Sequence, residues 1–278
     1  MDKVLITGGT GTLGTEIIKQ MYGKYDITVF SRNEVFQVEM KRNFSNVNFI
    51  IGDVRDEWAV ECASRGMKYI IHLAAIKHVP ICEQQPKEAV ETNINGTSNV
   101  IKAAIRNSVH TVINISTDKA VNPTSLYGLT KAVAERLAVM ANIINTTRFI
   151  TVRSGNIFGS SGSVIPFFIN QVKKNNTIPL TNGRMTRFFI LAEDLALDII
   201  NLLTAEPVLF YELKSIISFR MRDIAEVIKE LYGNDDTIIK KIGMRDGEKM
   251  HEELNGVSSY DVVDSKHKFK EMLIKWGN

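Results

Sequence analysis

The sequence is poor in the residues and runs that mark several classes of protein. Its two cysteines, Cys62 and Cys82, match no metal-binding or redox spacing, so we expect free thiols in a reducing compartment. The histidines show no metal spacing either, and we expect no bound metal. No apolar run is long enough to cross a bilayer, and the segment from Met1 runs directly into a predicted strand without a signal peptide. These absences predict a cytoplasmic protein that does not bind a membrane.

A large excess of charge of one sign is also absent. The 34 Lys and Arg residues nearly balance the 31 Asp and Glu residues, for a formal net charge of +3, and there is no dense basic run. We therefore expect no binding of nucleic acid, although a modest positive balance suits an anionic small substrate. The length of 278 residues and the 44% hydrophobic content are sufficient for a full globular core.

Apolar residues alternate between strand and helix patterns along the first part of the chain. Short β-branched or apolar runs predict parallel strands at residues 4–6, 27–30, 47–51, 69–73, 110–115 and 149–152. Between them, apolar residues at three- and four-residue steps predict helices, including 13–21, 89–106 and one with an apolar face formed by Leu126, Leu129, Val133, Leu137 and Met140. The pattern is typical of an α/β fold with a Rossmann-type doubly wound parallel sheet.

The pattern becomes irregular after Arg153. Candidate helices there cover residues 164–174, 193–203 and 221–232. We interpret residues 1–160 as the Rossmann domain, with residues 185–210 packing back onto it. Residues 161–278 are then a smaller α/β carboxyl-terminal lobe for the substrate.

A glycine-rich loop lies between the first predicted strand and the first predicted helix. Gly8, Gly11 and Gly14 satisfy one dinucleotide-binding spacing, and Gly9 with Gly11 and Gly14 satisfies another. Glycines there permit a tight turn and close approach of the backbone to a pyrophosphate, while the helix amino terminus offers unpaired N–H groups. The alternative is a glycine-rich surface turn, which the strand before and the helix after disfavour. The predicted cofactor contacts in the loop are Gly8, Thr10, Gly11, Thr12, Leu13 and Gly14.

The end of the second predicted strand decides between NAD and NADP. An acidic residue there would bind the ribose 2′-hydroxyl of NAD, whereas an Arg accommodates a 2′-phosphate. The strand ends in Ser31-Arg32-Asn33, with no carboxylate before Glu34. We therefore predict NADP, with NAD less favoured; the alternative is that Arg32 is only an exposed loop cation. Further along the chain, Asp53 and Val54 are placed to reach the adenine, and Ala74 and Ala75 are small where the backbone must pass close to the cofactor.

The catalytic residues are expected directly after the strand predicted at residues 110–115. Asp118 and Lys119 follow its carboxyl end, where open α/β sheets place their ligands. Tyr127 and Lys131 are four residues apart and share one face of the next helix, which Thr124 or Ser125 can cap. A nearby ammonium would lower the pKa of Tyr127 from its ordinary value of about 10 and make it a useful base. The Tyr-x-x-x-Lys spacing alone is common by chance, and its placement after a buried strand gives it weight.

Together these residues resemble the extended short-chain dehydrogenase/reductases. The matching motifs are the glycine loop, Asp53-Val54, His72-Leu73-Ala74-Ala75, Asn93-x-x-Gly96-Thr97 and Tyr127-x-x-x-Lys131. More specific stretches resemble the polysaccharide-biosynthesis branch, and within it the configuration-inverting UDP-N-acetylglucosamine 4,6-dehydratases. These stretches are residues 74–80, 116–120, 153–160, 162–167, 185–189 and 245–252.

The resemblance implies a reaction and a set of residues. Tyr127 would remove the proton of the sugar 4-hydroxyl with help from Thr117 and Lys131, Lys119 would take the carbon 5 proton, and Asp118 would protonate the leaving 6-hydroxyl. Inversion at carbon 5 is then expected, giving a UDP-4-keto-6-deoxy-hexosamine from UDP-N-acetylglucosamine with bound NADP as returning hydride carrier. Further cofactor contacts implied by the resemblance are Leu73, Lys77, Asn93, Ser116 and Ile157. The implied substrate contacts are Lys77, Asn156, Val164, Arg187, Arg245 and Glu248.

Two other functions remain open at this point. One is a UDP-sugar 4-epimerase or a configuration-retaining 4,6-dehydratase of the same superfamily. The other, more remote, is a dinucleotide-binding sensor without catalysis, which the presence of both Tyr127 and Lys131 disfavours. The expected partners are a UDP-sugar and further copies of the chain, as a dimer or hexamer.

Overall fold

The alternation of strand and helix patterns produces a parallel sheet in the computed structural model, which describes residues 1–144, 146–206, 208–213 and 215–277. The chain forms two units. The first contains Met1–Ser154 and Ala192–Leu213, and the second contains Gly155–Leu191 and Lys214–Asn278. The segment that returns to the first unit therefore begins at Ala192 rather than at residue 185, because the strand before it pairs within the second unit.

Seven parallel strands form the sheet of the first unit within the described residues, in the order β10-β6-β5-β4-β1-β2-β3. The order reverses between β1 and β4, which is where doubly wound sheets bind ligands. The strands are β1 (Lys3–Thr7), β2 (Asp26–Ser31), β3 (Asn48–Ile51), β4 (Tyr69–His72), β5 (Thr111–Thr117), β6 (Arg148–Ser154) and β10 (Phe210–Tyr211). The predicted Rossmann-type sheet is confirmed.

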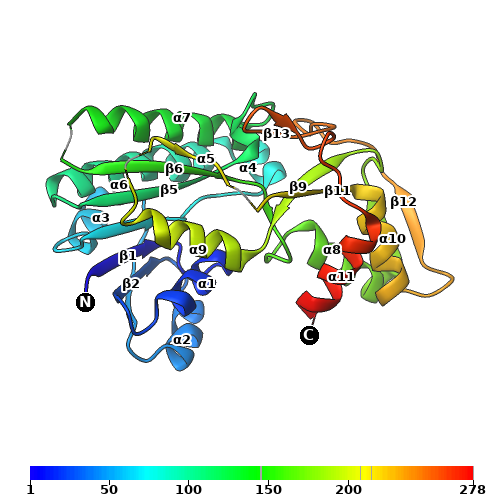
Figure 1. Cartoon of the computed structure of the whole chain (residues 1–278), viewed down its shortest axis with the longest axis horizontal. Helices are drawn as coiled ribbons and strands as arrows, with labels where there is room; N and C mark the ends of the chain where they lie inside the picture. The colour runs from blue at the N-terminus through cyan, green and yellow to red at the C-terminus, as the bar shows by residue number, and fades with distance from the viewer. Residues whose placement is uncertain (145, 207, 214, 278) are drawn as a thin grey trace. The chain divides into compact units, whose positions relative to one another are not determined.

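Helices cover both faces of this sheet, with α1 and α9 on the opposite side from α7 (Figure 1). Their apolar residues join those of the strands, as in the cluster of Leu5, Ile70 and Val112 with α3, α6 and α7. The helices are α1 (Thr12–Met21), α2 (Glu34–Asn43), α3 (Glu57–Ala63), α4 (Val79–Gln84), α5 (Pro86–Val90), α6 (Gly96–Arg106), α7 (Leu126–Ala141) and α9 (Ala192–Leu202). Short helical turns are η1 (Glu91–Asn95), η2 (Asp118–Ala120) and η3 (Asn142–Ile144).

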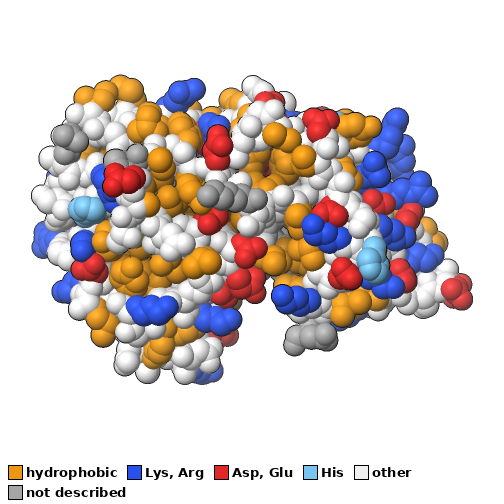
Figure 2. Space-filling model, viewed as in Figure 1, with side chains coloured by type: hydrophobic (Ala, Val, Ile, Leu, Met, Phe, Trp, Pro, Cys, Tyr) orange, Lys and Arg blue, Asp and Glu red, His pale blue; other side chains and the backbone are white. Residues whose placement is uncertain are grey.

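The helix α7 buries a different face from the one expected. Leu129, Val133 and Met140 are 49%, 44% and 61% exposed, whereas Ala134 and Ala138 are buried. Small side chains let the helix approach the sheet closely, so the buried face is the one that carries the alanines. The predicted helix is confirmed, although three of the five residues of its apolar face are exposed, and Figure 2 shows hydrophobic side chains at the surface near the end of α7.

The second unit contains small sheets around an aromatic core. β9 (Thr186–Ile190) lies between β7 (Asn156–Ile157) and β11 (Ile217–Arg220), β12 (Ile238–Lys241) pairs with β8 (Thr177–Leu180), and β13 (Glu253–Leu254) pairs with β14 (Val257–Ser258). The helices are α8 (Val164–Asn175), α10 (Met221–Tyr232) and α11 (Lys266–Gly277). In the core, the ring of Phe158 lies 5.6 Å from that of Phe269 and 6.0 Å from that of Phe189.

Candidate functional site

The glycine loop joins β1 to α1 and has the form that a pyrophosphate needs. Gly8 has a φ of +69°, and a Cβ placed on it would lie 2.8 Å from the backbone nitrogen of Ala74. The loop thus lies directly against the chain that follows β4. Gly11 is the residue before α1, and no side chain caps that end of the helix. The amino end of α1 is consequently a place where backbone N–H groups can bind an anion.

At the end of β2, Arg32 is placed to meet a charged group. Its side chain is 58% exposed, and its guanidinium lies 3.9 Å from the Asp53 carboxylate. Ser31 accepts a hydrogen bond from the buried Gln37, and Asn33 caps α2 by accepting from the N–H of Phe36. The side chain of Asn33 therefore serves the fold, which leaves Arg32 as the cation presented at this point.

Arg55 binds Asp53 and was missed by the sequence analysis. Its Nη2 lies 2.6 Å from Asp53 Oδ2, and it also reaches Glu88 at 2.7 Å. Burial acts to raise the pKa of Asp53, but the hydrogen bonds and charge of Arg55 outweigh it and hold that pKa below its ordinary value. The sequence signal that could have indicated this pair is the position of Arg55 two residues after Asp53 in a turn.

Asn93 holds the backbone that follows the small residues after β4. Its Oδ1 accepts from the N–H of Ile76 at 2.8 Å, and its Nδ2 donates to the carbonyl of Ile76 and to Thr130 Oγ1, both at 3.0 Å. These contacts use its side chain within the protein. Leu73, Ala74 and Lys77 lie on this same connection between β4 and α4, where Lys77 is exposed.

The carboxyl end of β5 brings together the residues expected to carry the chemistry. Asp118 is fully buried, and its Oδ1 accepts from Thr117 Oγ1 at 2.9 Å and from Lys119 Nζ at 3.0 Å. Among the described residues, Asp118 Oδ2 and the hydroxyl of Ser116 are buried without a hydrogen-bond partner. Buried polar atoms are rarely left unpaired, so both are suited to meet a ligand.

Tyr127 begins α7, which Ser125 caps by accepting from the N–H of Gly128 at 3.2 Å, as predicted for one of two residues. Burial raises the pKa of Tyr127 to about 12, opposed by the charge of Lys119 and a hydrogen bond with Thr117. The expectation that Lys131 lowers this pKa was wrong. The cation that favours the phenolate is Lys119, and desolvation outweighs it.

Lys131 is buried one turn further along α7. Its burial lowers its pKa to about 8, although the charge of Glu135 acts in the opposite direction. Glu135 is itself paired with Arg153 at 2.7 Å. Lys131 is therefore a buried amine whose charge changes near neutral to mildly alkaline pH.

In the second unit, the candidate substrate residues are only partly free. Arg187 donates to the carbonyl oxygens of Thr186 and Lys249 at 2.7 and 2.9 Å, so its guanidinium braces the backbone. Glu248 accepts from the N–H of Arg245 at 3.0 Å and closes a turn that leaves the Arg245 side chain exposed. In Figure 2, Lys and Arg side chains gather near β12, the strand that precedes this turn.

Three further candidates lie where the second unit begins. Asn156 and Ile157 form β7, and the amide of Asn156 donates to the carbonyl of Phe188 at 2.9 Å. Val164 is the first residue of α8, next to Ser163, whose hydroxyl is buried without a partner among the described residues. The amino end of α8 is thus a second place where backbone N–H groups can bind an anion.

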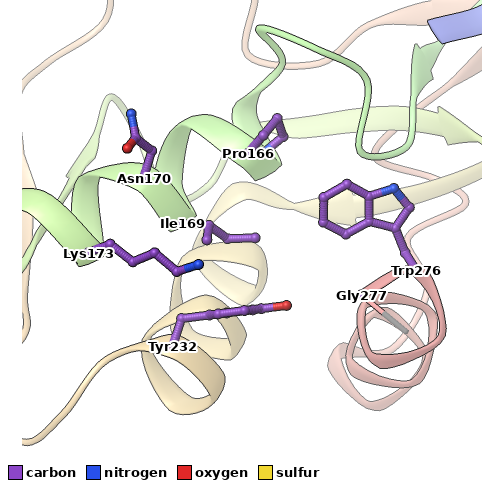
Figure 3. Close-up of a pocket in the computed structure, with 7 residues that line it drawn as sticks. All are labelled: Pro166, Ile169, Asn170, Lys173, Tyr232, Trp276 and Gly277. Carbon is purple, nitrogen blue, oxygen red and sulfur yellow. The ribbon is translucent and has the colours of Figure 1, made fainter.

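A separate groove in the second unit is lined by none of the candidate residues. It lies between α8, α10 and the end of α11; on one side, Lys173 Nζ is 5.8 Å from the ring centroid of Tyr232, and Trp276 lies opposite (Figure 3). The other lining residues are Pro166, Ile169, Asn170, Trp276 and Gly277.

Two kinds of feature are absent from the described part of the chain. No group of three or more His, Cys, Asp or Glu side chains there is arranged to hold a metal ion. No helix there has the length and apolar character to cross a membrane.

Proteins of a known family are similar to this chain over most of its length. Residues 4–275 match the family described as polysaccharide biosynthesis protein. A UDP-N-acetylglucosamine 4,6-dehydratase (inverting) of Campylobacter jejuni is 40% identical over 258 residues, covering 90% of this chain and 76% of that protein. A UDP-glucose 4-epimerase of Rickettsia canadensis is 38% identical over 279 residues, covering 96% and 81%.

Solved structures agree on the fold. Pen from Bacillus thuringiensis is 33% identical with a TM-score of 0.93, covering 99% of this chain and 98% of that one. DesIV, a dTDP-glucose 4,6-dehydratase from Streptomyces venezuelae with NAD bound, is 21% identical with a TM-score of 0.85 and shows the shared fold. The chain therefore belongs to the polysaccharide biosynthesis protein family, within the nucleotide-sugar dehydratases and epimerases of the extended short-chain dehydrogenase/reductase fold.

Proposed function

We propose that this protein is a lyase that converts UDP-N-acetylglucosamine to a UDP-4-keto-6-deoxy-hexosamine with inversion at carbon 5. The observation that carries the proposal is the cluster at the end of β5, where Asp118 accepts hydrogen bonds from Thr117 and Lys119 and keeps one carboxylate oxygen unpaired. An acid and an amine side by side are what the loss of water from adjacent carbons requires. Similarity to a protein named for that reaction supports the assignment.

The residues of the first unit fit a nicotinamide dinucleotide. The glycine loop and the uncapped end of α1 suit the pyrophosphate, and the unpaired hydroxyl of Ser116 suits a polar group of the ligand. When bound, the dinucleotide would supply a hydride acceptor and then a hydride donor for the sugar. We propose NADP over NAD because Arg32 is the exposed charge at the end of β2, while Asp53 is already paired with Arg55.

Each proton of the proposed reaction has a residue to carry it. Tyr127 takes the proton of the sugar 4-hydroxyl, and Thr117 holds that oxygen. Lys119, as the neutral amine, takes the proton from carbon 5. Asp118, as the carboxylic acid, protonates the 6-hydroxyl, which leaves as water. A bound dinucleotide would carry the hydride of carbon 4 to carbon 6, and carbon 5 regains a proton that comes from the solvent. The net change is the loss of the 4-hydroxyl proton and of the 6-hydroxyl, which together make one water.

For the sugar nucleotide we propose the residues that the sequence motifs imply, each judged by its own chemistry. Lys77 and Arg245 are exposed cations that suit a diphosphate, and Glu248 can accept from ribose hydroxyls. Asn156, Val164 and Arg187 complete the proposed set. Since Arg187 already binds backbone carbonyls, its role in this proposal is to hold the segment around Lys249 as well as to add positive charge.

A 4-epimerase is the second candidate, because relatives with that name match 95–96% of the chain. The two functions differ at carbons 5 and 6. Incubation with UDP-N-acetylglucosamine in deuterated water, followed by proton NMR and mass spectrometry, separates them. A dehydratase gives a product lighter by one water with deuterium at carbon 5. An epimerase gives a product of unchanged mass without that exchange, and this result would overturn the proposal.

We also propose that the chain forms a homo-oligomer, a dimer or a hexamer. The exposed apolar residues Leu129, Val133 and Met140 of α7 support it, because exposed apolar surface is often covered in an interface.

A further inference from the structure

His72 lies at the carboxyl end of β4 between two threonine hydroxyls. Its side chain is 1% exposed. Its Nδ1 lies 2.7 Å from Thr7 Oγ1, and its Nε2 lies 3.1 Å from Thr97 Oγ1. Thr7 is the last residue of β1, immediately before the glycine loop, and Thr97 lies in the first turn of α6. The ring therefore links the end of β1, where the glycine loop begins, to the first turn of α6.

The partners of the two threonines determine which ring nitrogen carries the proton. Thr97 Oγ1 donates to the carbonyl of Asn93 at 2.7 Å, so it accepts from His72 and Nε2 must be protonated. Thr7 Oγ1 then donates to Nδ1 and accepts from the N–H of Ala74 at 3.4 Å. With the proton on Nδ1 instead, the hydroxyl proton of Thr7 would have no acceptor. Thr97 would then have to donate to Nε2, and the carbonyl of Asn93 would lose its hydrogen bond from Thr97.

The ring is also held neutral. Burial, helped by the charge of Lys131, lowers the pKa of His72 to about 3. A second proton on the ring would put a donor against the Thr7 hydroxyl, which is itself donating, and would place two cations together in the core. The bridge is therefore intact throughout the neutral pH range.

From Thr97 the contacts continue to the helix that carries Tyr127. The carbonyl of Asn93 lies in η1, a π-helical turn between α5 and α6, and such turns are frequent at functional sites. The side chain of Asn93 donates to Thr130 Oγ1 at 3.0 Å, and Thr130 donates to the carbonyl of Tyr127 at 2.9 Å. One buried series of hydrogen bonds thus joins the glycine loop to the first turn of α7.

We propose that His72, as a neutral imidazole with its proton on Nε2, is a positioning residue that holds the glycine loop and the Tyr127 helix at a fixed separation. It touches neither substrate nor reacting atoms. The inference rests on the proposed function in one respect, that the glycine loop binds the dinucleotide. A rigid link between these two elements matters because hydride transfer and proton transfer must occur at one carbon, and small misplacement is costly.

The test compares Thr97→Val, which keeps the shape but removes the acceptor of His72, with Thr97→Ser, which restores it. Ser64→Ala is the matched control, because Ser64, the residue after α3, is buried and donates one hydrogen bond at 2.8 Å to the carbonyl of Val60, outside the series. NADPH binding is measured by its fluorescence, and kcat and KM are measured with UDP-N-acetylglucosamine. Melting temperatures of all variants show the loss of stability from one buried hydrogen bond.

We expect Thr97→Val to weaken NADPH binding and to lower kcat, each by roughly tenfold, with little change in the KM for the sugar. Thr97→Ser should lie within about twofold of wild type, as should Ser64→Ala despite a comparable loss of stability. Equal kcat and NADPH affinity for Thr97→Val, Ser64→Ala and wild type would overturn the positioning role alone. Absence of dinucleotide binding by the wild type would instead overturn the proposed cofactor, and the positioning role with it.

A second measurement reports on the wild-type protein directly. Nitrogen-15 NMR of the wild type, with His72→Gln used to assign the resonance among the five histidines, reports the protonation of each ring nitrogen. We expect a protonated Nε2 and an unprotonated Nδ1 from about pH 5 to pH 9, given the pKa of about 3. A proton on Nδ1, or a doubly protonated ring, would contradict the inference.

Discussion

Lys119 Nζ lies 3.0 Å from Asp118 Oδ1, and the two residues are adjacent at the carboxyl end of β5. Asp118 is fully buried, whereas the side chain of Lys119 is 21% exposed. The pair places an amine at the edge of the site and a carboxyl beneath it, within range of Tyr127. This relationship gives the proposed elimination its base and its acid, and it is the first feature to test.

Replacing Lys119 with Met should stop exchange of the carbon 5 proton. Tyr127 and Lys131 remain, so oxidation at carbon 4 stays possible, while removal of a general base lowers turnover by about 10²–10⁴-fold. Deuterium incorporation at carbon 5 of UDP-N-acetylglucosamine, followed by NMR, measures the step directly. The exposed Lys24→Met serves as control and should exchange normally. Exchange by Lys119→Met at the wild-type rate would show that another group is the base.

Replacing Arg32 with Ala should weaken NADP and leave NAD almost unchanged. A charge-assisted hydrogen bond to a 2′-phosphate is worth about 1.5–3 kcal/mol, which corresponds to roughly ten- to a hundredfold in affinity. Titration calorimetry with both cofactors measures the difference. Arg42→Ala removes another exposed Arg, near the end of α2, and should change neither affinity. Similar losses for NADP and NAD would rule out recognition of the 2′-phosphate by Arg32.

Because Lys131 is buried, the free energy of unfolding should depend on pH in the alkaline range. Its pKa falls from 10.5 to about 8 on folding, so between these values the unfolded chain holds more protons. Raising the pH through this window therefore stabilises the folded state, by an amount on the order of 3 kcal/mol. Tyr127, with its pKa raised from 10.0 to about 12, has the opposite effect above about pH 10.

Comparison with Lys131→Met isolates the effect of the lysine. Urea unfolding of the protein without added cofactor, at several pH values, gives the free energy of unfolding of each variant. The free energy of unfolding of the wild type should increase relative to that of Lys131→Met as the pH rises from about 8. The difference should level off near pH 10.5. A difference that does not change with pH in that range would mean that Lys131 keeps its ordinary pKa.

The exposed stripe of α7 should control association. Val133→Glu places a charge among the exposed Leu129 and Met140, and an interface there would lose stability because a buried charge without a partner is costly. Light scattering after gel filtration should show a smaller species than wild type, with unchanged circular dichroism. Leu197→Glu on α9 alters another exposed apolar residue and should keep the wild-type mass. An unchanged mass for Val133→Glu would exclude this face.

Local pattern was sufficient to predict several elements in each unit. The runs at residues 4–6 and 27–30 became β1 and β2, and the helix at 221–232 has the bounds of α10, because apolar periodicity and capping signals are properties of neighbouring residues. The grouping of Asp118 and Lys119 at the end of β5 followed in the same way from the position of a strand end. The cofactor and substrate assignments remain proposals.

Only the tertiary structure decided which face of α7 is buried and in which direction the pKa of a buried group such as Tyr127 shifts. Leu129 and Val133 repeat at helical steps, yet Ala134 and Ala138 face the sheet, since close approach favours small side chains. The pKa of Tyr127 rises because desolvation outweighs the charge of Lys119, a balance of distances that no spacing encodes. The bridge from Thr7 through His72 to Thr97 joins residues 65 and 25 positions apart, and such contacts exist only once the strands have been assembled.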